Sequence, residues 1–398
     1  MKMIGRILVA RALRGFADGF IAVVLPAYLL ALGLGQLDVG LISTATLLGS
    51  ALTTLAVGRW GHRFPVRRLL LAAALLMAAT GLGFAGFSSF WPLLLVAFAG
   101  TLNPSSGDAS VFMPLDHTML AGAADRTTVF SRYTFLGSMA GALGALVAGL
   151  PEWLGGRVAL LDALRGMFVL YALVGLVVWA LYLGLPNAQA GEEKPNAPLG
   201  PSRGMVWRLA ALFSIDAFAG GLVLNSLLAL WLFDRFGMSL AAAGAFFFWT
   251  GLLSAVSQLA AGPLARRIGM VNTMVFTHIP SSFFLIAAAL SSSLHVALGF
   301  LLARALLSQM DVPARGAFVM TVVTPAERPA AASFTSVPRS LASALSPSLT
   351  GAMFAAGAMA APLVACGVLK IVYDLALFAA FRRVERKGPA SSSRAPAG

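Results

Sequence analysis

Ten ionisable side chains lie inside long apolar stretches of this 398-residue chain, five of them acidic and five basic. They are Arg11, Arg14, Asp18, Asp108, Asp216, Arg304, Asp311, Arg339, Lys370 and Asp374. A charged side chain at the centre of a bilayer costs about 2.5–3.5 kcal/mol on insertion scales. Ten such costs would exceed the folding stability of a typical protein, which is about 5–15 kcal/mol. We therefore expect these side chains to pair with one another or to face a wet cavity, where they can bind a charged solute or carry a proton.

The expected depth of these charged residues in the membrane separates candidates for binding from candidates for a structural role. At a rise of about 1.5 Å per residue, Asp18 lies roughly 15 Å from the start of its helix, and Asp216, Arg304 and Arg339 reach a comparable depth. These four, with Arg14 and the polar Asn225, are our candidates for substrate or proton binding. Asp18 has an alternative, an intrahelical pair with Arg14 four residues earlier. Asp216 has no basic residue three or four positions away, which favours a functional role.

The other buried charges are interpreted as structural. Asp108 and Asp311 are expected near the ends of their helices, beside basic loops, where they would form salt bridges of a gate. Lys370 and Asp374 stand four residues apart and are expected to pair with each other. His278 is expected to make an interhelical hydrogen bond, with a role as proton switch as the alternative.

The stretches that hold these residues are long enough to span a membrane. Hydrophobic residues make up 59% of the chain, charged residues 11%, and mean hydropathy is +0.86. Because a bilayer core needs about 20 apolar residues per helix, we predict an all-α integral membrane protein with twelve transmembrane helices. The predicted spans are 8–33, 37–57, 68–88, 91–113, 130–150, 166–185, 207–232, 239–261, 270–291, 294–313, 330–356 and 360–381.

Basic residues predict the orientation of these spans. Twenty Lys and Arg residues fall in alternate gaps and in the terminal segments, whereas the opposite gaps hold only Arg157, Arg165 and Arg235. Since positively charged loops stay in the cytoplasm, both termini are predicted to be cytoplasmic. This distribution also accounts for the net charge of +13 without nucleic acid as a partner.

The two halves of the chain resemble each other at a constant shift. Asp125-Arg126 matches Glu327-Arg328 and Gly149 matches Gly351 at a shift of 202, and Asp108 matches Asp311 at 203. This repeat predicts two pseudo-symmetric six-helix bundles, residues 1–186 and 207–387. A Pro- and Gly-rich cytoplasmic linker, 187–206, would join them, and a disordered tail, 388–398, would follow.

A motif after the second span carries a family resemblance. Gly58-Arg59-Trp60-Gly61-His62-Arg63 and its echo Gly262-Pro263-Leu264-Ala265-Arg266-Arg267 resemble the loop motif of the major facilitator superfamily (MFS). The resemblance implies the MFS fold and a gate in which a carboxylate of the motif pairs with basic groups. His62 and Arg266 stand where the family has that acid. We therefore expect Asp108 and Asp311 to supply the negative charge. The gate or structural candidates are Gly58, Arg63, Asp108, Arg126, Gly262, Arg267, Asp311 and Arg328.

The fifth span contains Gly137, Gly141, Gly144 and Gly149. Drug-exporting members of the family carry a glycine-rich motif at this place, but it includes a proline that these glycines lack. We interpret them as small residues for close helix packing.

Taken with the resemblance, these features predict a secondary active transporter that moves a small organic solute by alternating access, coupled to protons through Asp18 or Asp216. The alternatives are a proton-driven multidrug or metabolite efflux antiporter and an MFS-fold sensor without transport. An enzyme is not expected, because the four histidines, at 62, 117, 278 and 295, are scattered. No phosphate-binding loop is present for ATP, and we expect no cofactor or metal. A monomer in the bacterial inner membrane is expected, with a lipid bilayer, a small-molecule substrate and protons as its partners.

Overall fold

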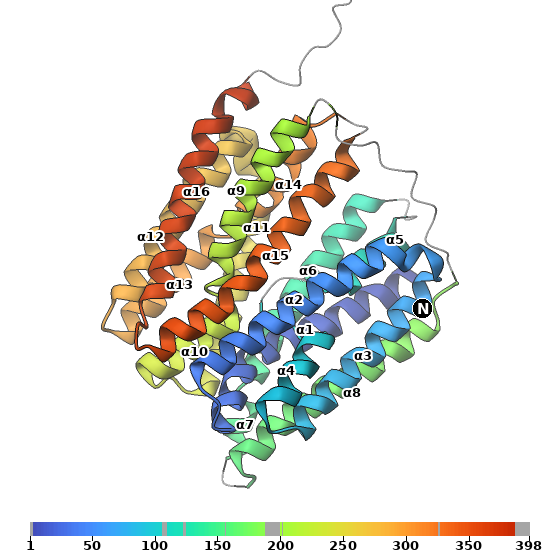
Figure 1. Ribbon diagram of the computed structural model, residues 1–398, viewed down its shortest axis with the longest axis vertical. Coiled ribbons are helices and arrows are strands. Elements are labelled where there is room, and N and C mark those ends of the chain that lie inside the picture. The colour runs from blue at the N-terminus through green and yellow to red at the C-terminus, as the bar shows by residue number, and fades with distance from the viewer. Residues whose placement is uncertain are drawn as a thin grey trace, which may run out of the picture.

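The computed structural model describes residues 3–105, 110–121, 125–155, 157–187, 200, 202–324 and 327–386. These residues form helices and connecting segments without a β-strand (Figure 1). The helices are α1 (Met3–Ala31), α2 (Gln36–Trp60), η1 (Gly61–Arg63), α3 (Val66–Gly86), α4 (Phe90–Ala99), α5 (Phe112–Leu120), α6 (Arg126–Val147), α7 (Leu150–Trp153), α8 (Leu160–Leu183), α9 (Arg203–Gly221), α10 (Asn225–Phe236), α11 (Leu240–Ile268), α12 (Met270–Leu290), α13 (Leu294–Leu307), α14 (Asp311–Val322), α15 (Arg328–Ala355) and α16 (Ala361–Arg386).

Each predicted span coincides with a helix or with two consecutive helices. Among the described residues, nine helical segments are long and apolar enough to cross a membrane. The predicted spans outside these nine correspond to α1 and α15, which carry ionisable residues, and to α4, which has only 10 residues. The all-α membrane architecture is thus confirmed, and the number of twelve crossings stays a prediction.

Three predicted spans are interrupted. The fourth is divided into α4 and α5, the seventh into α9 and α10, and the tenth into α13 and α14. Both α5 and α14 continue past the predicted ends of their spans, to Leu120 and Val322. Discontinuous helices are where many transporters place their substrate and ion sites.

The helices before residue 187 pack against one another in a pattern that recurs after residue 203. In the first group α1 contacts α6 and α3 contacts α8, and in the second α9 contacts α15 and α12 contacts α16. Glycines allow the close approach of α1 and α6, because a Cβ atom on Gly19 would collide with the carbonyl oxygen of Gly141. Gly144 likewise packs against the backbone of Phe16, as expected for a packing role. The bounds of the two predicted bundles stay predictions, and residues 188–199 and 388–398 lie outside the described residues.

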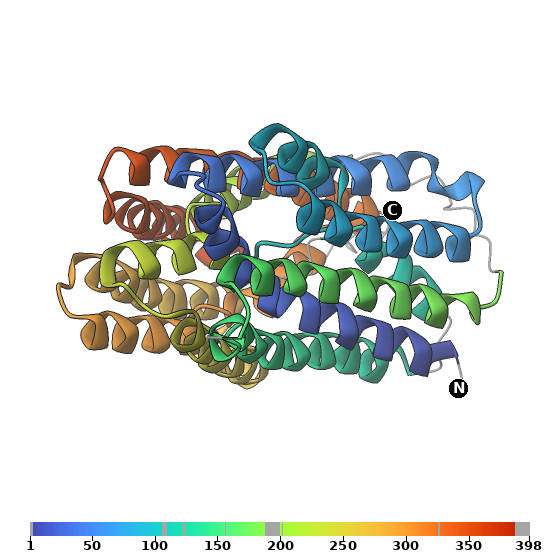
Figure 2. The ribbon, with the colours of Figure 1, turned by 90° about the horizontal axis from the view of Figure 1, so that it is seen from below.

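The two groups are joined through α2 with α15 and α6 with α11 (Figures 1 and 2). We call the end where α1 begins and α16 ends the basic end, since Arg59, Arg63 and Arg266 also lie there. At the opposite end, Gln36 Nε2 donates to Asp234 Oδ2 at 3.1 Å and the Ala241 amide donates to Glu152 Oε2 at 2.7 Å. Close contacts therefore hold the two groups together at the end away from the basic end.

Glycines also line this junction. A Cβ atom on Gly351 of α15 would lie 2.9 Å from the Cα atom of Gly40 in α2 and 2.6 Å from the carbonyl oxygen of Gln36. Gly149 approaches Ala241 of α11, where an added Cβ atom would lie 2.8 Å from the Cα atom. The matched glycines of the sequence repeat, Gly149 and Gly351, thus both lie where one group touches the other.

Candidate functional site

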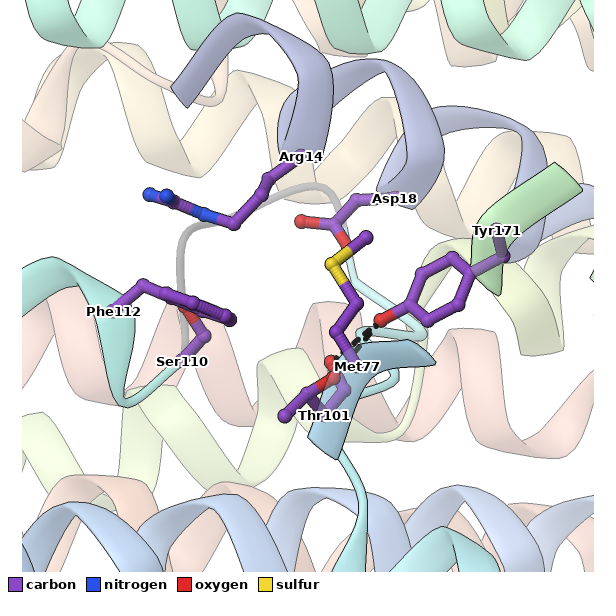
Figure 3. Close-up of a pocket in the computed structure, with 7 residues that line it drawn as sticks. All are labelled: Arg14, Asp18, Met77, Thr101, Ser110, Phe112 and Tyr171. Carbon is purple, nitrogen blue, oxygen red and sulfur yellow. Dashed lines mark hydrogen bonds between the residues drawn. The ribbon is translucent and has the colours of Figure 1, made fainter. Parts of the chain in front are cut away.

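A pocket lies inside the first group of helices, next to α1 (Figure 3). Arg14 and Asp18, one helical turn apart, line it together with Met77 of α3 and Tyr171 of α8. Thr101 and Ser110, from the interruption between α4 and α5, and Phe112 at the start of α5 complete the lining. The space between these side chains, including the part that is open to solvent, is about 200 Å³. The interrupted fourth span thus contributes to a cavity that carries both signs of charge.

Hydrogen bonds hold the polar side chains around Asp18 in place. Tyr171 Oη donates to the carbonyl oxygen of Thr101 at 3.0 Å. Asn103 Nδ2 lies 3.5 Å from Asp18 Oδ2, at the limit of a hydrogen bond. Asp18 itself is half-buried. Its carboxyl group therefore faces the pocket among groups that can donate hydrogen bonds, an environment suited to binding a polar solute.

Arg14 forms a fully buried ion pair that the sequence did not predict. Its Nη2 atom lies 2.6 Å from Asp116 Oδ2, and Asp116 on α5 has no exposed surface. Tyr133 and Tyr182 donate to the two oxygens of this carboxylate at 3.0 and 3.1 Å. The guanidinium also lies 4.3 Å from the ring centre of Phe112. Four helices, α1, α5, α6 and α8, are thus connected through one carboxylate.

A larger ion-pair network lies inside the second group. Asp216 Oδ2 on α9 is 2.8 Å from Arg315 Nη1 on α14, and its Oδ1 atom is 2.6 Å from Lys370 Nζ on α16. Arg315 Nη1 is also 3.3 Å from Asp311 Oδ2. On the other side, His278 Nδ1 on α12 is 3.1 Å from both carboxylate oxygens of Asp374. We call these six residues, Asp216, His278, Asp311, Arg315, Lys370 and Asp374, the six-residue network.

This network corrects two expectations. Lys370 and Asp374 do not form the expected pair, because Lys370 contacts Asp216 and Asp374 contacts His278 on neighbouring helices. Asp311 begins α14 in the middle of the tenth span, whereas the sequence placed it near the end of that span. It pairs with Arg315, which the sequence had placed in a basic loop. The expected interhelical bond of His278 is present.

The two buried arginine–aspartate pairs have opposite polarity, because the first-half pair has its arginine on the first span and the second-half pair has its aspartate on the seventh span. Arg14 and Asp216 occupy matching positions in the first and seventh spans at a shift of 202, the shift of the sequence repeat. Their partners, Asp116 and Arg315, lie in α5 and α14, the second parts of the fourth and tenth spans. An ion pair therefore joins the first span to the fourth, and an ion pair of reversed polarity joins the corresponding seventh span to the tenth. Asp116 and Arg315 are 199 residues apart, which is not the shift of the repeat, so the repeat alone does not point to Asp116.

Arg304 and Arg339 are not brought into the network. Both are half-buried, on α13 and α15, and neither forms an ion pair with another described residue. Asn225 is half-buried at the first position of α10, directly after the interruption of the seventh span. The structure thus groups Arg14 with Asp18, and Asp216 with Asp311. Among the described residues, no hydrogen bond or ion pair connects Arg304, Arg339 or Asn225 to either group.

The remaining gate candidates lie mainly at the basic end. Gly58, Arg63, Gly262 and Arg267 are exposed near the ends of α2 and α11, and Arg328 Nε donates to the carbonyl oxygen of Met320 at 3.1 Å. Arg126 begins α6, and Asp108 lies outside the described residues. Asp125 and Glu327, matched in the repeat, are the N-cap residues of α6 and α15. Among the residues that the structure describes, no three His, Cys, Asp or Glu side chains gather as a metal site. The gate roles stay predictions.

Comparison with known proteins identifies the family. The sequence profile of the Major Facilitator Superfamily matches residues 7–308, about three quarters of the chain. The chain belongs to the Major Facilitator Superfamily. It is also 23% identical over 416 residues to the uncharacterized membrane protein YJR124C of Saccharomyces cerevisiae, covering 94% of this chain and 93% of the yeast protein.

Solved structures show the same fold. A point mutant of the nucleoside transporter NupG superposes with a TM-score of 0.77 at 14% identity, covering 96% of this chain and 100% of NupG. A bacterial homologue of the lysosomal transporter Spinster, inward-facing and unoccupied, gives 0.77 at 16% identity, with 98% of each chain covered. The inward-open xylose transporter XylE from E. coli gives 0.73 at 15% identity, with 94% and 96% covered. These similarities show the fold. The family match places the protein among the multi-pass membrane transporters of the MFS type, whose members bind small molecules and lie in a lipid bilayer.

Proposed function

We propose that the protein is a monomeric, proton-coupled secondary transporter that moves a small organic solute by alternating access. The observation that carries this proposal is the pocket beside α1, where Asp18 and Arg14 meet at the interrupted fourth span within an MFS fold. The close junction of the two helix groups at the end opposite the basic end supports a conformation open toward the basic end. The distribution of basic residues supports a cytoplasmic basic end, and the Arg- and Ala-rich composition supports a bacterial inner membrane.

The lining of the pocket suggests which chemical groups it binds, because charged, polar and apolar side chains all face it. The pocket is narrow in this conformation, and we propose that it receives one polar group of the solute. Met77, Phe112 and Tyr171 would contact the apolar part of the solute. Asp18 would bind a donor or a positive charge.

Arg304 and Arg339 are proposed as contacts for an anionic part of the solute. Both are half-buried cations without an ion pair to another described residue, and a buried charge is expensive unless it is compensated. An anion bound between the two helix groups would compensate it. Asn225, at the start of α10, would add a hydrogen bond.

Asp18 and Asp216 differ in their suitability for proton coupling. Asp216 is already bound by Arg315 and Lys370 at 2.8 and 2.6 Å, so we assign it a structural part in the ion-pair network. Asp18 lines the pocket, where arrival of the solute changes its surroundings. We propose that Asp18 couples solute binding to protonation.

The test is transport in proteoliposomes with an imposed pH gradient, screening organic anions, amino acids and cationic dyes. Asp18→Asn should reduce gradient-driven accumulation at least tenfold while solute exchange without a gradient persists. Arg304→Ala and Arg339→Ala should weaken binding, most for anionic solutes. The matched control is Asp162→Asn, because Asp162 is an exposed acid on α8. If the wild-type protein transports none of these solutes, the result would contradict a transport function. If Asp18→Asn still accumulates solute fully, Asp18 is excluded as the coupling residue.

A further inference from the structure

His278 occupies an unusual place in the second group of helices. The side chain is on α12, away from the pocket, and only 3% of the residue is exposed. Its Nδ1 atom faces the carboxylate of Asp374 at 3.1 Å. Its Nε2 atom lies 3.4 Å from Lys370 Nζ and 4.0 Å from Asp216 Oδ1. Both ring nitrogens therefore face charged groups, one on each side.

Counted by itself, the six-residue network is neutral when it holds one extra proton. It contains three carboxylates, two permanent cations and the imidazole of His278. With a neutral imidazole the formal charge is −1, and with an imidazolium it is zero. Buried charges without a counter-charge cost several kcal/mol each, and histidine is the side chain that changes charge near neutral pH. One bound proton would therefore neutralise the excess negative charge within the network.

We propose that His278 and Asp374 form a proton-binding site, which rests on the transporter function proposed above and adds to it a second proton position beyond Asp18. Nδ1–H donates to Asp374 in both the neutral and the protonated imidazole ring. The exchangeable proton comes from water and forms a new N–H bond with the lone pair of Nε2. The proton is released to water when the site opens to the other side of the membrane. No other bond forms or breaks, and nothing is oxidised or reduced.

Protonation of Nε2 acts directly on the neighbouring ion pair. In the neutral ring, the Nε2 lone pair accepts from the Lys370 ammonium, which also binds Asp216 at 2.6 Å. In the imidazolium, Nε2–H repels Lys370 and attracts Asp216. Lys370 lies on α16 and Asp216 lies on α9, five residues before that helix ends at Gly221. Proton uptake thus weakens the connection between α16 and α9 close to the interruption of the seventh span.

The other helices around the site carry charges that set its affinity for the proton. Arg315 and Asp311 on α14 complete the network, and the Tyr373 ring on α16 packs edge-on against His278 with ring centres 6.2 Å apart. Arg304 on α13 and Arg339 on α15 are half-buried cations on the neighbouring helices of this half. Because they oppose proton uptake, an anion bound beside them would favour it. This arrangement would couple an anionic solute to a proton.

Direct observation of the histidine tests the site without requiring a known solute. The three other histidines are replaced in the variant His62→Asn/His117→Asn/His295→Asn, so that the nitrogen NMR signals of labelled protein in lipid nanodiscs belong to His278. We expect lowering the pH to add a proton to Nε2, while Nδ1 keeps its own. Adding Asp374→Asn should lower the protonated fraction at pH 6 at least fivefold.

The control retains exposed His295 alone, and Asp374→Asn should leave its titration unchanged. A His278 ring that stays neutral down to pH 5, or that titrates identically with and without Asp374, would overturn the proposal. This result would stand even if the proposed transport function were wrong, because the measurement involves no solute.

Transport provides the second test. In proteoliposomes, His278→Asn should reduce accumulation driven by a pH gradient at least tenfold and exchange without a gradient by less than about threefold. His295→Asn should match the wild type in both. Undiminished gradient-driven accumulation in His278→Asn would exclude His278 as part of the coupling, whereas loss of accumulation in Asp18→Asn alone would place all coupling in the pocket.

Discussion

The buried pair of Arg14 and Asp116 is a strong candidate for a structural anchor. Removing one partner of a buried ion pair leaves an uncompensated charge, which typically costs 3–5 kcal/mol. The pair of Asp216 and Arg315 joins the corresponding spans of the other half with the reversed polarity. We infer that a pair of exchanged charges would also be neutralised at Arg14 and Asp116.

We predict that Arg14→Asp alone and Asp116→Arg alone each destabilise the protein by about 3–5 kcal/mol, because each places like charges in contact. The double variant Arg14→Asp/Asp116→Arg should recover most of that loss. Thermal unfolding in detergent, followed by tryptophan fluorescence, measures the effect. The same exchange at Asp162 and Arg165, a partly exposed pair 3.5 Å apart, should change the stability less. A double variant less stable than either single one would contradict the inversion argument.

Glu327 offers a pH-dependent test outside the membrane-spanning segments. Hydrogen bonds from Ser202 and Thr324, and from the backbone amide of Gly200, lower its pKa from 4.5 to about 2. A depressed carboxyl pKa stabilises the folded state fully above pH 4.5, and this contribution is lost as pH falls toward 2. We predict that Glu327→Gln lowers the melting temperature at pH 7, and that the difference shrinks between pH 4.5 and pH 2. A difference that is independent of pH would show that the carboxylate charge contributes nothing.

At the scale of elements, the glycine contact of α2 with α15 determines how tightly one end of the molecule closes. Gly40 and Gly351 leave no room for a side chain between these helices. A larger residue there must push the two helix groups apart at the end opposite the basic end. The closed arrangement at that end would then lose stability relative to an open one.

We predict that Gly351→Val exposes the pocket to the end opposite the basic end. A cysteine introduced by Ser110→Cys in the pocket lining reports this. Labelling by an impermeant maleimide from that end should rise at least tenfold. The one native cysteine, Cys366, is fully buried and gives little background. Gly299→Val is the control, because a Cβ atom there meets nothing within 4 Å. Equal labelling of the two variants would show that the contact does not control closure.

The elements were predictable from sequence to a much greater degree than the site. An apolar stretch predicts a membrane helix whatever its neighbours are, so the predicted spans fall on observed helices. The predicted ends of the fourth and tenth spans were wrong, because polar residues interrupt the apolar stretches there while α5 and α14 continue beyond them. Asp116 and Arg315 therefore counted as loop residues. Lys370 and Asp374 looked like a local pair, but their partners are 154 and 96 residues away, and only the packing of helices brings these together.

For the whole molecule, the fold and the distribution of basic residues make one topology testable. We predict that reporter domains fused after Asn196 and after Gly388 are cytoplasmic and that one fused after Ser292, between α12 and α13, is external. The positive-inside rule supplies the physical reason. Paired phosphatase and fluorescent-protein fusions provide the measurement. A cytoplasmic reporter at Ser292 would be incompatible with twelve crossings and with cytoplasmic termini.

The long sequence separation of the buried ion pairs has a consequence for biosynthesis. Asp216 leaves the ribosome 99 residues before Arg315 and 154 residues before Lys370. At about 5–20 residues per second, its carboxylate waits roughly 5–30 seconds for these partners. During that time an unpaired charge in hydrocarbon would cost about 2.5–3.5 kcal/mol. We therefore expect the nascent α9 to remain in the insertion machinery or at the membrane surface until α14 and α16 arrive, and to enter the bilayer together with them.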